Sequence, residues 1–173
     1  MKIQLKSKRS IPVVLMAIPI IAMALLMSPV QAFSADSEVG DVYMVSTIKG
    51  KAWARIDGEI VAVPVTIELT CKVTEEFHNI VLFKPVRGNI VLNGTVYQVN
   101  QAWWRGIYYR CSERALIQGS ASDSEGNTLY FILHTKDRAY TQGGTFMNAV
   151  GGMRDPNGVY WRTELLLWRY KFN

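Results

Sequence analysis

The segment VAVPVTIELTCKV, residues 61–73, restricts the fold more than any other stretch of the chain. Every second residue from Val61 to Val73 is apolar, and most of the residues between them are polar or small. A period of two is the repeat of a β-strand that buries one face. Cys71 falls on the buried face. Pro64 has no backbone N–H, which predicts an edge or a bulge at that position.

Two tight turns join this strand to its neighbours in the sequence. Asp57-Gly58 and Asn93-Gly94 each stand between β-forming runs, and both dipeptides suit a two-residue hairpin turn that needs positive φ. Each turn sets a register in which apolar residues share one face. The expected pairs are Ala54 with Val61, Ala52 with Val63, Gly50 with Val65, Leu92 with Thr95, Ile90 with Tyr97, Gly88 with Val99, Val91 with Val96, Asn89 with Gln98 and Arg87 with Asn100.

The second half of the chain has the same organisation. SDSEGNT (residues 122–128) and RDPNGVY (residues 154–160) predict turns, with Gly126 in a left-handed conformation. No long segment has a helical period. We therefore expect an all-β fold, a single antiparallel β-barrel or β-sandwich of about eight to ten strands built from successive hairpins. The periodicity does not separate a barrel from a sandwich.

The first 32 residues differ in composition from the rest. A basic start is followed by the apolar run of residues 11–27, and Val30 and Ala32 are small residues at the positions that a signal peptidase reads. We expect a signal peptide over residues 1–32 and a single all-β domain over residues 33–173, secreted or at the cell surface. The alternative is an uncleaved membrane anchor, in which case the N-terminal segment alone contacts the membrane.

The net charge of +5 is concentrated in the same segment. Four of the nineteen basic residues and none of the fourteen acidic residues precede position 33, so the remainder carries a net charge of +1. Nucleic acid as a partner is disfavoured, because phosphate binding needs a strongly basic surface.

The chain contains two cysteines, Cys71 and Cys111. In an oxidising compartment an even number of cysteines favours disulfide formation, so we expect one bridge between them. The alternative is a pair of unpaired, buried thiols.

Tryptophan and arginine recur as neighbours, which most simply indicates an aromatic side chain facing inward and an arginine facing outward in a strand. Two places depart from this pattern. The hairpin register puts Trp53 on the outer face with Arg55, and Trp103 and Trp104, followed by Arg105, cannot both face inward. Outward aromatic residues beside arginines predict a ligand-binding surface, unless a loop or a second sheet covers them.

A second candidate site lies on the polar face of the Asn93-Gly94 hairpin. The register gathers one guanidinium and three amide side chains there, a set that suits a hydroxyl-rich ligand or a carboxylate. These residues are Arg87, Asn89, Gln98 and Asn100. The alternative is an ordinary solvated face of an antiparallel sheet.

Signals for catalysis or for a cofactor are weak. The two histidines, His78 and His134, have no neighbouring ligands at metal spacing, and most acidic residues stand in turns. We predict no catalytic residue, metal or cofactor. Asn93-Gly94-Thr95 is a formal sequon, which makes Asn93 a potential glycosylation position.

We therefore expect a non-catalytic domain that binds a carbohydrate or another polar surface ligand through the residues named above. An alternative is a structural or adhesive surface protein with protein partners, which would use the same outward aromatics or an open strand edge. A small-molecule carrier barrel and a glycoside hydrolase-type enzyme are further alternatives.

Overall fold

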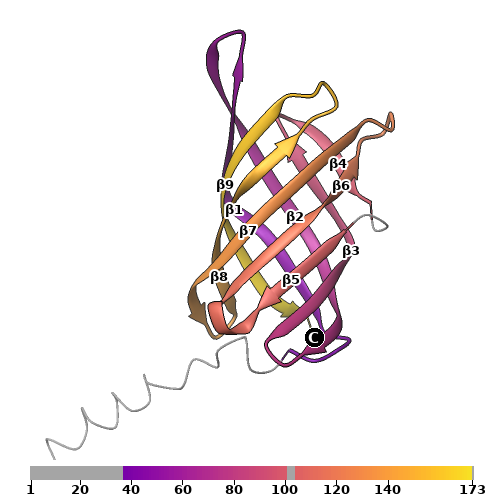
Figure 1. The fold of residues 1–173 in the computed structure, drawn as a ribbon, viewed down its shortest axis with the longest axis vertical. Coiled ribbons are helices and arrows are strands. Elements are labelled where there is room, and N and C mark those ends of the chain that lie inside the picture. The colour runs from indigo at the N-terminus through magenta and orange to yellow at the C-terminus, as the bar shows by residue number, and fades with distance from the viewer. Residues whose placement is uncertain (1–36, 101–103, 173) are drawn as a thin grey trace, which may run out of the picture. The chain divides into compact units, whose positions relative to one another are not determined.

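The computed structural model describes residues 37–100 and 104–172, and within these ranges the chain forms β-strands and one short 3-10 turn, η2 (Arg110–Ser112), without an α-helix. The predicted all-β fold is confirmed (Figure 1). The expected signal peptide lies outside the described residues. The strands are β1 (Val42–Ile56), β2 (Glu59–Phe77), β3 (Ile80–Leu92), β4 (Thr95–Val99), β5 (Arg105–Tyr109), β6 (Arg114–Ser122), β7 (Thr128–Thr141), β8 (Gly144–Arg154) and β9 (Tyr160–Phe172).

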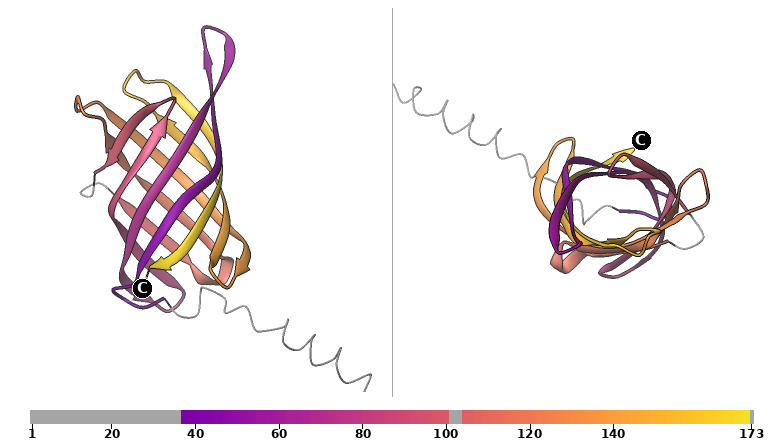
Figure 2. Two further views of the ribbon diagram at one scale, coloured as in Figure 1. Left: turned by 180° about the vertical axis from the view of Figure 1, so that it is seen from behind. Right: turned by 90° about the horizontal axis from the view of Figure 1, so that it is seen from above.

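The nine strands form one antiparallel sheet, and eight of them pair in a closed ring. The order around the ring is β1, β2, β3, β5, β6, β7, β8 and β9, and β9 pairs with β1. β4 and β5 share one place in it. Both β3 and β6 pair with β5 along one part of their length and with β4 at the other end. In the view from above, the strands surround a common centre (Figure 2).

The alternation in residues 61–73 correctly predicted the inner face of β2. Residues 63, 65, 67, 69, 71 and 73 are buried, and those between them are exposed or half-buried. The edge expected at Pro64 is also present, because β2 begins to pair with β3 only at Val65. The Pro64 carbonyl accepts a hydrogen bond of 3.2 Å from the Asn93 N–H.

The first predicted hairpin forms as expected at its turn. Asp57 and Gly58 have φ angles of 50° and 88°, and Ala54 pairs with Val61 and Ala52 with Val63. The expected pair of Gly50 with Val65 is not part of the ladder, which is interrupted between residues 46 and 51 of β1, although Gly50 lies against the Val65 carbonyl. At this irregularity the Thr47 hydroxyl replaces backbone groups of the ladder. It accepts a hydrogen bond of 2.7 Å from the Ile67 N–H and donates one of 3.1 Å to the Ile67 carbonyl.

The second hairpin is correct near its turn and wrong further away. Asn93 and Gly94 have φ angles of 51° and 82°, and the four pairs expected nearest the turn all form. The register does not extend to the expected pairs of Gly88 with Val99 and Arg87 with Asn100. The chain has left β3 by then, and the Asn100 N–H donates to the Ser120 carbonyl at 3.0 Å.

Both later turns were also predicted correctly. Gly126 has a φ of 85°, and the Asp123 carboxylate accepts the backbone N–H groups of Glu125 and Asn127. In the turn before β9, the Gly158 N–H donates to the Asp155 carbonyl at 3.0 Å. The carboxylate of Asp155 also accepts the indole N–H of Trp161 at 2.9 Å, which ties this turn to the core.

The inner faces of the strands form two clusters of buried side chains. The larger one fills most of the ring and contains Leu69, Phe131 and Leu167, and the smaller one at the other end contains Tyr43, Val73 and Tyr108. Phe83 packs against both. The interior is therefore an apolar core, in agreement with a ring of eight strands that its own side chains can fill.

The predicted disulfide is wrong. Cys71 is buried on the inner face of β2, whereas Cys111 is exposed in η2, and both are free thiols that do not lie close together. The alternation gave the face of Cys71 correctly. It gave nothing for Cys111, because β5 ends at Tyr109 and the 3-10 turn breaks the strand period.

The thiols should therefore differ in reactivity. Under native conditions a water-soluble thiol reagent should modify one cysteine, Cys111, and in denaturant it should modify two. The measurement is a count of modified thiols by mass spectrometry. A native count of zero with two thiols released only by reductant would restore the disulfide.

Burial raises the pKa of the Cys71 thiol to about 12, from a usual value of 9.0. Since the unfolded chain releases this proton first, unfolding becomes easier as the pH rises above about 9, by about 1.4 kcal/mol per pH unit. Urea unfolding at pH 8 and pH 10 under reducing conditions checks this. The loss of stability should be smaller in Cys71→Val, and an equal loss in both proteins would contradict the assignment.

Candidate functional site

Aromatic and arginine side chains alternate on the outer face of four neighbouring strands, β7, β8, β9 and β1. In one row across the sheet, Tyr130 pairs with Arg154, and Arg154 pairs with Tyr160. The next row runs from Ile132 through Gly152 and Arg162 to Trp53. We call these seven residues the aromatic–arginine surface.

The two tyrosines of this surface are prominent. Tyr130 is 60% exposed and Tyr160 is 58% exposed. The side chain of Tyr160 lies down on the sheet over Gly152, since a Cβ atom at residue 152 would come within 2.0 Å of the Tyr160 hydroxyl oxygen and within 2.3 Å of its Cζ. Only glycine leaves room for the hydroxyl end of the Tyr160 ring at this place, and the side chain as a whole stays accessible to solvent.

A groove of about 390 Å³ runs beside the Tyr160 ring. Tyr130, Ile132, Arg154 and Gln118 contribute to its walls, and Gly152 contributes to its floor. This volume lies within the range of known ligand sites, roughly 300–1,000 Å³. The groove is open to solvent along the sheet, which suits an extended ligand better than an enclosed one.

Trp53 and Arg55 lie where the first hairpin register predicted. Trp53 is half-buried on the outer face of β1, between Arg162 of β9 and Ala62 of β2. Arg55 is exposed two residues further along the same face. The sequence thus identified one side of the aromatic–arginine surface. It did not identify Tyr130, Arg154 and Tyr160, because their adjacency depends on the order of strands in the ring.

The polar cluster predicted on the second hairpin is present in part. Arg87, Asn89 and Gln98 line a groove of about 550 Å³ together with Glu68 and Thr70. The Arg87 Nε donates to the Thr70 hydroxyl at 3.5 Å. The expected fourth member, Asn100, is not in the hairpin ladder, because its backbone turns to β6.

The remaining predicted residues do not form one site. Trp103 lies outside the described residues, and Arg105 is exposed at the start of β5. Trp104 is the inward member of the tryptophan pair, 2% exposed, with its ring over Gly119 and 5.4 Å from the Phe131 ring. Its indole is therefore part of the core and cannot stack on an external ligand.

A small pocket lies inside the ring where the two core clusters meet. Its volume is about 50 Å³, and Cys71, Phe83, Met147 and Thr135 are among the residues that line it. This space accommodates roughly three or four water-sized groups. A carrier of drug-sized ligands needs a pocket several times larger, so the geometry does not favour the carrier alternative.

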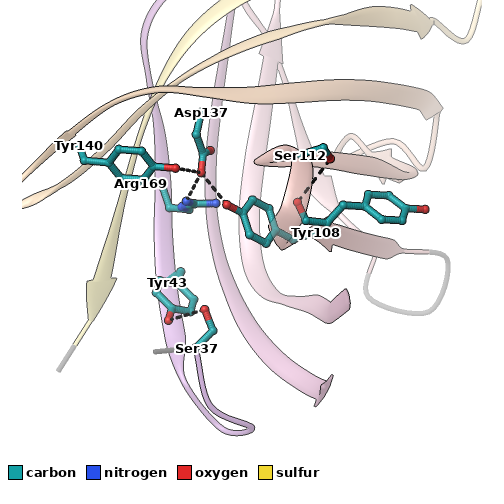
Figure 3. A network of polar contacts seen from close by, with 8 residues as sticks. Ser37, Tyr43, Tyr108, Ser112, Asp137, Tyr140 and Arg169 are labelled. Atoms are coloured by element: carbon teal, nitrogen blue, oxygen red, sulfur yellow. Dashed lines mark hydrogen bonds and ion pairs between the residues drawn. The ribbon is translucent and has the colours of Figure 1, made fainter. Parts of the chain in front are cut away.

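Next to this pocket lies a buried polar network that the sequence analysis missed (Figure 3). Three donors converge on one oxygen of Asp137, its Oδ2: the Tyr108 hydroxyl at 2.8 Å, the Arg169 Nη2 at 2.9 Å and the Tyr140 hydroxyl at 3.3 Å. The Arg169 guanidinium also lies 5.0 Å from the centre of the Tyr108 ring. Burial, followed by the Asp137 charge, raises the pKa of Tyr108 well above its usual range, so its hydroxyl remains a donor.

The sequence predicted that in each Trp-Arg pair the tryptophan faces inward and the arginine faces outward. The buried Arg169 of this network is an exception. The pattern holds at Trp161 and Arg162, but at Trp168 and Arg169 the arginine is the inner residue. The strand period contained the signal, since residues 161, 163, 165, 167 and 169 share the buried face of β9. The same count along β7 from Leu129 brings Asp137 inside.

Other candidate chemistry receives no support from the geometry. His134 and Asp137 project from opposite faces of β7, so they form no dyad. Within residues 37–100 and 104–172, no three side chains of the kinds that bind metals come together. Among the described residues no helix has the length and apolar character needed to cross a membrane.

Asp137 neutralises the buried guanidinium of Arg169, so replacing Asp137 should strongly destabilise the fold. We expect Asp137→Asn to lower the free energy of unfolding by about 3–5 kcal/mol, since Arg169 would keep its charge without a counter-ion. The double variant Asp137→Leu/Arg169→Met should recover much of this loss, because it removes both charges. Urea unfolding measures all three proteins. A double variant as unstable as the single variant would show that the pairing of charges is not what matters.

The chain was also compared with protein-family models, with curated proteins and with solved structures. None of these three comparisons finds a match.

Proposed function

We propose that the domain is a non-catalytic binding module, secreted or at the cell surface, that holds a carbohydrate on its aromatic–arginine surface. In this proposal the ring of strands is a closed barrel with a filled interior, which keeps the outer face rigid. Trp53 and Arg55 extend the surface along β1. The ligand lies along the rows of side chains, parallel to the groove beside Tyr160.

The observation that carries this proposal is the position of Tyr160 over Gly152. An aromatic ring has a negative face, and the C–H groups on one side of a sugar ring are weakly positive, so the two stack face to face. Gly152 leaves room for the hydroxyl end of the Tyr160 ring on the sheet, and in the proposal the exposed part of this ring stacks on a sugar. Tyr130 is two strands away, roughly 10 Å at the usual strand spacing, a distance suited to a second sugar unit.

A second candidate function, adhesion to a protein partner, is favoured by the β1–β2 hairpin. β1 pairs with β9 only as far as Trp53, and β2 pairs with β3 only from Val65. Beyond these residues the two strands of the hairpin pair only with each other, apart from the Pro64 carbonyl that accepts the Asn93 N–H, and Ile60 is 72% exposed. Figure 1 shows this hairpin extending past the other strands. Its open edge could take a strand from another protein.

The surface proposal is tested by substitutions that change one aromatic face at a time. Gly152→Ala should push the Tyr160 ring off the sheet, and because the clash is with the end of a flexible side chain, stability should change little. Tyr160→Ala removes the ring. Each variant should bind a responsive glycan roughly tenfold more weakly, equivalent to about 1.4 kcal/mol.

The measurement is a titration of the domain against neutral and acidic cell-envelope glycans, followed by tryptophan fluorescence and by calorimetry. Tyr109→Ala is the matched control, because Tyr109 is also an exposed tyrosine but lies outside the surface, at the end of β5. No binding to any glycan would remove the proposal and leave protein adhesion as the stronger candidate. Equal loss in the control would show a non-specific effect.

A further inference from the structure

The charges around Tyr160 indicate which class of carbohydrate the surface takes. We infer that the ligand is an anionic polysaccharide with carboxylate groups, a polyuronate, and that Arg154 and Arg162 bind its carboxylates. This inference rests on the proposed function, because it assigns the ligand of the same surface.

The first observation is that the guanidinium groups of these two arginines have no partner among the described residues. Both residues are exposed, and apart from the backbone pairing of their strands neither side chain makes a hydrogen bond or an ion pair with another described group. Arg110 and Arg169, by contrast, are engaged within the fold. Arg110 pairs with Glu76 at 2.6 Å and donates to the His78 carbonyl, and Arg169 pairs with Asp137. The guanidinium groups beside Tyr160 are therefore available to an external anion.

The second observation is their spacing. Arg154 opposes Tyr160 and Arg162 opposes Gly152, so the two arginines are diagonal neighbours across β8 and β9, with Cα atoms roughly 7–8 Å apart. Each stands beside an aromatic residue, Arg154 beside Tyr160 and Arg162 beside Trp53. A sugar unit on the Tyr160 ring would thus have a guanidinium within reach of a substituent at its edge. The planar fork of arginine matches a carboxylate with two parallel hydrogen bonds.

The third observation is that acidic residues do not cancel this positive charge. Glu164, on the same face of β9, stands opposite Lys51 of β1, so those two charges offset one another. Glu59, at the tip of the hairpin, projects from the face opposite to that of Arg55, because Arg55 pairs with Ile60 and neighbours alternate. The Asp155 carboxylate, next to Arg154 in the chain, is held by the Val159 N–H and by the indole N–H of the buried Trp161. Arg154, Arg162 and Arg55 thus remain as a local excess of positive charge on the outer face.

This excess is a local property and does not follow from the composition. Residues 33–173 carry a net charge of only +1. A nearly neutral domain with a few unpaired arginines between aromatic faces does not have the broad basic surface that nucleic acid needs. It suits a ligand that combines sugar faces with well-separated single charges, as a polyuronate does.

The test compares one polymer in two charge states. Galacturonate, glucuronate and mannuronate oligomers are each titrated into the domain by calorimetry, alongside the same oligomers with their carboxyl groups methyl-esterified. We expect the acid form of the bound oligomer to bind at least tenfold more tightly than its ester at low salt. The difference should shrink as salt screens the charges.

Substitutions then locate the carboxylate sites. Arg154→Gln and Arg162→Gln should each reduce affinity for the acid form several-fold and leave affinity for the ester nearly unchanged. Arg114→Gln is the matched control, an exposed arginine of β6 that lies outside the surface. Arg87→Gln tests the other predicted groove, on β3.

Each outcome is decisive. Equal affinity for acid and ester would overturn the anionic assignment and leave the proposed carbohydrate function intact. A charge preference lost in Arg87→Gln but kept in Arg154→Gln and Arg162→Gln would overturn it as well, by moving the site to the β3 groove. Binding of neutral glycans alone would do the same. The absence of binding to every glycan, acidic or neutral, would overturn both the inference and the proposed function.

Discussion

The pairing of β1 with both β2 and β9 is the contact on which the rest of this structure depends. It joins Val42 to Lys72 on one side and to Phe172 on the other, so the sheet has no free edge along most of its length. A sheet left open at this seam would expose two rows of unpaired backbone groups and the apolar face that now forms the core. The inward and outward positions of every strand are fixed once the seam is closed, because the side-chain period is two.

Closure also explains why a charged pair can lie inside an otherwise apolar ring. Asp137 and Arg169 come from β7 and β9, which are separated by β8, and each occupies an inward position that an apolar residue takes elsewhere in its strand. A buried ion pair adds little stability compared with apolar residues of similar size, but an unmatched charge is strongly destabilising. The pair therefore favours a single register between these strands, since a slip of one residue would separate the charges.

Local features of the fold could be predicted from the sequence, and long-range ones could not. Asp57-Gly58 and Asn93-Gly94 specify their turns and the nearest pairs through backbone conformation alone. Further from each turn the predicted ladder does not continue: the Thr47 hydroxyl inserts into the ladder of the first hairpin, and Asn100 leaves the second. The alternation of apolar residues placed Cys71 on the buried face of β2. It did not show at which level of the ring Cys71 lies, and it gave no information about Cys111, which lies beyond the end of β5.

The candidate site divides in the same way. Trp53 and Arg55 could be placed on the outer face because they belong to a hairpin whose register is local. Tyr130, Arg154 and Tyr160 come from three strands, and nothing in their own segments indicates that they form one row. The glycine at position 152 was equally uninformative alone, because its meaning depends on the Tyr160 ring that lies over it.

The path of β9 separates the aromatic–arginine surface from the end of the ring where the strand finishes. The strand begins at Tyr160, in the aromatic–arginine surface, and ends at Phe172, beside Val42. Thirteen residues of strand place these ends roughly 40 Å apart. A molecule tethered through the end that holds Val42 and Phe172 would hold Tyr160 and its neighbouring arginines far from the support, so that immobilisation at that end keeps them open to a polymer in solution.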